Sequence, residues 1–183
     1  MSFGNKMKQV FEMLVFEEQA ISKFSKDKAN TKFAYLVLLI MGLAYGFGLG
    51  IFTGPLVIIF MLIGVITAII GIWIIVLIYH LLALIFGGKG KLIEYFRAYA
   101  SLNEIQWILV IPLLGLFLSA VASLWIFIVN IALLKNIHKL STAKAVIVGI
   151  LPVIIIIVLL VAGIVSLIGP LTLENMAGQA FIK

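Results

Sequence analysis

Long apolar stretches alternate with short polar breaks along most of this chain. The apolar stretches predict membrane-spanning helices, because about 20 apolar residues at 1.5 Å per residue cross a bilayer. We expect an all-α, polytopic integral membrane domain over residues 33–183. Its five predicted transmembrane helices are at about 33–52, 55–86, 92–111, 113–134 and 143–168.

Residues 1–32 are polar enough to lie in water and form a separate cytoplasmic segment. Apolar residues from Phe3 to Phe24 recur at helical spacing, so the pattern predicts one amphipathic helix from residue 2 to about 30. Such a helix either lies on the membrane surface or contacts a partner, or it packs under the cytoplasmic ends of the chain's own spans. The segment has no uninterrupted apolar core, so we predict no signal peptide.

The predicted span 92–111 is far more polar than the others. Five of its polar residues recur at spacings of three, three, four and three, which places them on one stripe of a helix. This candidate functional stripe contains Lys91, Glu94, Arg97, Ser101 and Glu104. Glu94 and Arg97 are close enough along a helix to pair at the cytoplasmic interface.

Glu104 is expected to be the deepest carboxylate in the protein, with Arg97, His80, Asn130 or a helix terminus as its partner. An ionisable group at membrane depth indicates either a proton or ion site or a buried contact that fixes helix packing. We favour the packing role, because a transport path would normally show more than one deep carboxylate.

Two further patterns indicate contacts with helices and lipids. Gly42, Gly46 and Gly50 are spaced by four, which lets another helix approach closely. We favour packing within the chain over a dimer interface, although a homo-oligomer stays open. Lys89 and Lys91 flank a glycine turn and are candidate contacts for lipid headgroups.

The composition supports the membrane class and fixes an expected orientation. Hydrophobic residues make up 64% of the 183 residues, charged residues make up 11%, and the mean hydropathy is +1.31. The net charge of +6 comes from dispersed lysines, which does not suggest binding to nucleic acid. With five spans, twelve of the thirteen Lys and Arg residues lie on one side, whereas four spans give ten against three. The positive-inside rule therefore favours five spans, with a cytoplasmic N-terminus and an extracytoplasmic or lumenal C-terminus.

The sequence contains no constellation typical of an enzyme. It has no cysteine, and the HExxH, GxSxG and P-loop patterns are missing. His80 is expected to lie at the membrane interface and His138 in a loop, and neither has the further ligands that a metal site needs. We predict no catalytic residues, metal or cofactor.

Three segments resemble a known family. They are the Gly54-Pro55 start of the second span, FGGKGKLIEYFRAYA at its end, and LLKNIHKLSTAKAV before the last span. In order and spacing they resemble the Yip-domain family of Ypt/Rab-GTPase-interacting membrane proteins, here as a prokaryotic, archaeal-type member. The resemblance implies five spans, a cytosolic N-terminus and no catalytic residues. Eukaryotic members are associated with membrane traffic through Rab binding or membrane shaping, but the short N-terminal segment gives no ground for carrying over Rab binding.

Two functions remain open from the sequence. The first is a non-enzymatic scaffold that binds the bilayer and a protein partner at the cytoplasmic face, or that shapes the membrane. The second is a small transporter, channel or lipid-handling protein that uses the polar stripe.

Overall fold

A computed structural model describes the backbone of residues 2–180 and the side chains of residues 2–166. The described backbone is largely helical and contains no strand. It divides into two compact units, Met1–Gly149 and Ile150–Lys183. The elements are α1 (Phe3–Leu14), α2 (Glu18–Lys26), α3 (Asn30–Gly50), η1 (Ile51–Leu56), α4 (Val57–Ile85), α5 (Leu92–Leu102), η2 (Asn103–Val110), α6 (Leu114–His138) and α7 (Thr142–Ala180).

The N-terminal segment is two helices, so the prediction of one helix from residue 2 to about 30 is wrong. The Ser2 side chain caps α1 by accepting a hydrogen bond from the Asn5 N–H. Phe16 has a φ of 67°, which breaks the helical path between α1 and α2. The apolar residues keep their helical spacing on both sides of this break. The spacing therefore gives no sign of a single residue with left-handed backbone angles.

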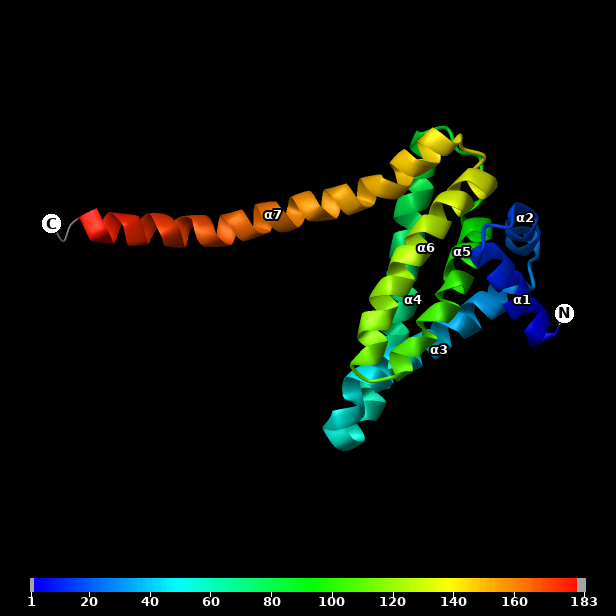
Figure 1. Cartoon of the computed structure of the whole chain (residues 1–183), viewed down its shortest axis with the longest axis horizontal. Coiled ribbons are helices and arrows are strands. Elements are labelled where there is room, and N and C mark those ends of the chain that lie inside the picture. The colour runs from blue at the N-terminus through cyan, green and yellow to red at the C-terminus, as the bar shows by residue number, and fades with distance from the viewer. Residues whose placement is uncertain (1, 181–183) are drawn as a thin grey trace. The chain divides into compact units, whose positions relative to one another are not determined.

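Helices α3 and α4 form an antiparallel hairpin that turns at η1, where Gly54 has a φ of 61° (Figure 1). Gly42 faces the backbone of Gly64 and Val65, and Gly46 faces the backbone of Phe60 and Met61. A methyl carbon at position 42 would lie 2.5 Å from the Val65 Cα atom. The small side chains therefore let the two backbones approach closely.

Gly50, the third glycine of the predicted packing stripe, faces the side chain of Phe60. All three glycines thus lie against α4 of the same chain. A dimer formed through this stripe would have to displace α4.

The predicted span 92–111 is helical, but it is not one continuous α-helix. The α-helix α5 ends at Leu102, and the 3₁₀-helix η2 continues to Val110. The Asn103 side-chain amide donates to the Tyr99 carbonyl at 2.9 Å, while its backbone N–H bonds to the Ala100 carbonyl. The Asn103 side chain thus takes the Tyr99 carbonyl that an α-helix would pair with the Asn103 N–H. The N–H bonds three residues back instead, as in a 3₁₀-helix.

The α5–η2 segment runs antiparallel to α6, as contacts at three levels show. The Lys89 N–H donates to the His138 carbonyl at 2.9 Å. Further along, the Tyr95 hydroxyl donates to Asn130 Oδ1, and Gln106 Nε2 donates to Ser123 Oγ at 2.8 Å. The segment therefore extends along most of the length of α6.

Helix α5 lies at the centre of the first unit. Each of its residues from Tyr95 to Leu102 is buried. Helices α1 and α2 lie beside it (Figure 1), and α3, α4 and α6 also contact it. By contrast, α4 exposes large aliphatic side chains such as Ile58, Leu62 and Ile66, as a lipid-facing helix does.

Three stretches of the described chain are long and apolar enough to cross a membrane: Asn30–Ile85, Leu114–His138 and Thr142–Ser166. The first stretch contains both α3 and α4. The predicted span 92–111 is not among them, and it carries three charged residues, Glu94, Arg97 and Glu104. The structure thus shows an all-helical membrane protein without confirming five transmembrane helices.

The close approach of α3 and α4 is directly testable. Gly46→Leu should destabilise the folded protein by about 1–3 kcal/mol or more, because the new side chain would overlap the α4 backbone. Gly71→Leu is the matched control, since a Cβ atom at Gly71 meets nothing within 4 Å. Thermal unfolding in detergent should show a lower midpoint for the first variant alone. Equal midpoints would contradict the packing role of Gly46.

Candidate functional site

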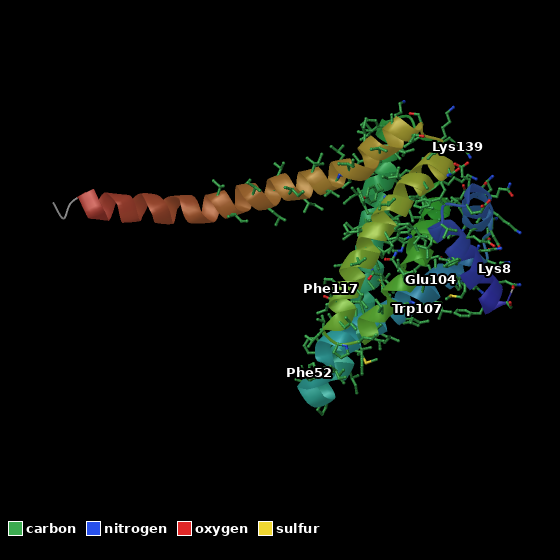
Figure 2. The ribbon with its side chains drawn as sticks, viewed as in Figure 1. Lys8, Phe52, Glu104, Trp107, Phe117 and Lys139 are labelled. Carbon is green, nitrogen blue, oxygen red and sulfur yellow. The ribbon has the colours of Figure 1, made fainter. Side chains whose placement is uncertain are left out.

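The predicted polar stripe begins at the surface and passes into the protein interior. Lys91 is exposed and precedes the first turn of α5, and it forms an ion pair with Glu94 at 3.7 Å. Arg97 and Ser101 are buried inside the bundle. Glu104 follows in η2, between the ends marked by Lys139 and Phe52 in Figure 2.

Arg97 joins three helices through its guanidinium group. Nε donates to Thr31 Oγ1 of α3 at 2.7 Å, and Nη1 donates to the Ser25 carbonyl of α2 at 2.9 Å. The expected pair of Glu94 and Arg97 is therefore wrong, since Glu94 pairs with Lys91. Arg97 is 7% exposed, so these bonds satisfy a charged group that has been taken out of water.

Glu104 lacks each of the expected side-chain partners. Its Oε2 atom is buried without a hydrogen-bond partner among the described residues. Arg97 bonds to the N-terminal segment, and Asn130 accepts from Tyr95. The structure thus leaves Glu104 as a buried carboxyl group without an ion pair among the described residues.

The change from α- to 3₁₀-geometry separates the polar side chains of η2. Side chains three residues apart eclipse each other in a 3₁₀-helix. Asn103, Gln106 and Leu109 therefore share one face, whereas Glu104 shares another with Trp107. A continuous α-helix would not separate these faces so sharply.

Two cavities flank η2, and each uses one of these faces. The apolar groove has a volume of about 390 Å³ and is lined by Ile40, Leu43, Ala44, Phe47, Met61, Trp107 and Val110. The polar cavity has a volume of about 320 Å³. It is lined by Met41, Tyr45, Gly64, Thr67, Ala68, Asn103, Gln106, Leu109, Leu116, Ser119 and Ser123. Neither lining includes Glu104.

A buried aromatic cluster joins α4, α5 and α6, and the sequence interpretation missed it. His138 was expected in a loop but is fully buried, with its ring 5.1 Å from those of His80 and Tyr95. Neither ring nitrogen of His138 has a hydrogen-bond partner among the described residues. The sequence feature that best fits this burial is Gly90, where only a glycine leaves room for the His138 ring. A Cβ atom at position 90 would lie 2.6 Å from His138 Nδ1.

The glycine turn that precedes α5 packs against this cluster. The N–H groups of Gly87, Gly88 and Lys89 donate to carbonyl oxygens of Leu84, Ala83 and His138. These three N–H groups are therefore not free to bind a lipid phosphate. The side chains of Lys89 and Lys91 are exposed.

Helices α1 and α2 are attached to the bundle along one face. Val10, Met13, Ile21 and Phe24 are fully buried. Beyond these apolar contacts, the Trp125 indole donates to the Leu14 carbonyl at 3.0 Å. The packing expected of an amphipathic helix against its own spans is therefore present.

An ion pair fastens the second helix to α6. Lys135 Nζ lies 2.8 Å from Glu18 Oε1. The hydrogen bond and charge of Lys135 lower the pKa of Glu18 below its ordinary value. Both side chains are largely exposed, so this pair contributes little to stability compared with the buried face.

Four apolar residues of α1 and of the turn after it are partly exposed, although Phe3 also contacts Phe33 of α3 and Phe16 also contacts Trp125. Phe3 is 49% exposed, Phe11 63%, Val15 53% and Phe16 39%. We call these four residues the N-terminal aromatic surface. Lys8 lies on the same helix and is exposed (Figure 2). An apolar surface next to basic residues is typical of a protein segment that binds a membrane interface or a partner.

The described residues hold no group of three or more His, Cys, Asp and Glu side chains that could bind a metal ion. Buried Glu104 and the pair of His80 and His138 are the ionisable groups inside the bundle that could carry chemistry. They lie on different parts of the fold, and Glu104 lines neither cavity described above.

Long apolar helices around a polar central segment define a helical integral membrane protein. A family model, the Yip1 domain, matches residues 11–163, and the chain belongs to this family. The match begins near the end of α1 and ends inside α7, so it includes α2 as well as the bundle. Comparisons with curated proteins and with solved structures found no match.

Loss of the Arg97 contacts should release the N-terminal segment. Arg97→Gln should cost about 1.5–3 kcal/mol per lost charged hydrogen bond, and faster amide exchange should be confined first to residues 2–32. Hydrogen–deuterium exchange with mass spectrometry measures this. Lys89→Gln is the control at an exposed site. Unchanged exchange in residues 2–32 of Arg97→Gln would contradict the role of Arg97.

Proposed function

We propose that this Yip1-family protein is a non-enzymatic membrane scaffold that acts at the cytoplasmic face. Its working part is the N-terminal aromatic surface, which the rigid attachment of α1 and α2 presents next to the bilayer. The single observation that carries the proposal is that α1 buries one apolar face on its own bundle and still exposes Phe3, Phe11 and Val15.

The proposed topology has five crossings. At 1.5 and 2.0 Å per residue, α5 and η2 together extend about 32 Å, which matches a hydrocarbon core of about 30 Å. The antiparallel contacts with α6 support a crossing by this segment. The charge distribution supports a cytoplasmic N-terminus and an extracytoplasmic or lumenal C-terminus.

In this orientation the N-terminal aromatic surface meets the cytoplasmic lipid headgroups. Exposed lysines of the cytoplasmic face, including Lys89 and Lys91, would contact anionic headgroups. We therefore propose that the helix pair occupies the headgroup region of one leaflet and so favours membrane curvature.

The transporter or channel alternative has weaker support. It relies on Glu104 as a site reached by water, and Glu104 is 9% exposed and lines neither cavity beside η2. A buried carboxyl group with polar neighbours such as Asn103 fits the packing role that the sequence also favoured. Lipid handling is treated separately below.

Substitutions at the N-terminal aromatic surface test the scaffold proposal. The wild-type protein should reduce the diameter of reconstituted vesicles. The triple variant Phe3→Ser, Phe11→Ser and Val15→Ser should not reduce it, because each lost apolar contact removes on the order of 1.5–3 kcal/mol of membrane affinity. Vesicle diameters are measured by electron microscopy at equal protein density. Deletion of residues 2–24 is less informative, since it would also expose the core under Val10 and Ile21.

The matched control changes polar exposed positions of the same segment, Glu17→Ser with Gln19→Ser, and should leave the vesicles unchanged. If the triple variant shapes vesicles as the wild type does, the membrane-shaping role is wrong. In that case, loss of a captured cytosolic protein in the same variant would assign the surface to a protein partner.

A further inference from the structure

We infer that the polar cavity beside η2 binds an uncharged lipid that carries a hydroxyl or amide N–H donor. The inference does not depend on the N-terminal helices. It rests on the chemistry of the lining, on the hydrogen bonds that the lining already makes, and on the place of the cavity among apolar helices.

The lining is rich in hydrogen-bonding groups and contains no charged side chain. Asn103 and Gln106 are each 6% exposed, and they share the face of η2 that borders the cavity. Ser119 and Ser123 contribute hydroxyl groups from α6, and Thr67 contributes one from α4. A charged headgroup would find no countercharge here, so an uncharged ligand is favoured.

The hydrogen bonds within the protein determine what a ligand must offer. Gln106 Nε2 donates to the Ser119 carbonyl and to Ser123 Oγ. The Ser119 hydroxyl donates to the Leu116 carbonyl, and the Ser123 hydroxyl donates to the Ser119 carbonyl. Because these donors are already used, the serine oxygens can serve a ligand as acceptors. A ligand that bonds to these serine oxygens therefore brings a donor.

The cavity opens on the outer surface of the first unit. Thr67, Leu116 and Ser123 are exposed on α4 and α6, and the outward faces of both helices are apolar. Met41, Leu109 and Leu116 provide apolar walls for a hydrocarbon chain. A volume of about 320 Å³ lies within the usual range of small-molecule sites. A lipid can thus place its apolar body along the walls and its donor against η2 and α6.

The cavity would also hold about ten water molecules at ~30 Å³ each. Water is the competing occupant, and a water-filled cavity would support the transporter alternative. The absence of charged groups in the lining favours the lipid, since a passage for ions or protons normally needs them.

The probe is diacylglycerol with a diazirine in one acyl chain, added to the full chain in liposomes. Illumination should label peptides of η2 and α6. The same lipid with its hydroxyl converted to a methyl ether should label them about tenfold less, as expected for the loss of one or two hydrogen bonds. Equal labelling by both probes, or no labelling of these peptides, would overturn the inference.

Two variants distinguish the cavity from general lipid contact. Ala68→Phe fills the cavity and should remove the labelling, whereas Gly71→Phe on the same helix meets open space and should not. The double variant Ser119→Ala and Ser123→Ala should lower labelling about tenfold through lost acceptors, with Ser166→Ala as its control. Labelling that survives both changes would overturn the proposal.

A separate readout tests for water. The chain has no cysteine, so Ser123→Cys introduces a single thiol. The lipid proposal predicts no reaction of this thiol with a membrane-impermeant reagent in sealed liposomes. Rapid reaction would show a water-filled passage and reject a lipid occupant.

Discussion

The structure depends on one constraint: a polar segment inside a membrane must be covered by protein. The α5–η2 segment carries Arg97, Asn103, Glu104 and Gln106, which hydrocarbon would not solvate. The apolar helices surround it and direct their Ile and Leu side chains outward. The least apolar segment between α3 and α6 is therefore the centre of the bundle.

The same constraint links the N-terminal helices to the bundle. The buried guanidinium of Arg97 donates its hydrogen bonds to α2 and to the start of α3, so the N-terminal segment completes the cover of α5. This explains how α1 and α2 can be part of the folded core while the other face of α1 exposes Phe11 and Val15. A surface held in this way can act on a membrane without first being ordered.

Sequence reasoning succeeded where a pattern had a single structural meaning. Apolar length predicted the helices, and the spacing of Gly42, Gly46 and Gly50 predicted a close helix contact. It could not find features set by one residue or by distant contacts. The break at Phe16 depends on one φ angle, the 3₁₀-helix depends on the Asn103 side chain, and the burial of His138 depends on where α4 and α5 place their ends. Helical periodicity contains none of this information.

The central claim is that α5–η2 crosses the bilayer inside the bundle. Single cysteines at Thr53, Lys89 and Leu113 of the otherwise cysteine-free chain test it most directly, by labelling with an impermeant reagent from each side of the membrane. The account predicts that Leu113→Cys reacts on the same side as Thr53→Cys and opposite to Lys89→Cys. Reaction of Leu113→Cys on the side of Lys89→Cys would contradict it.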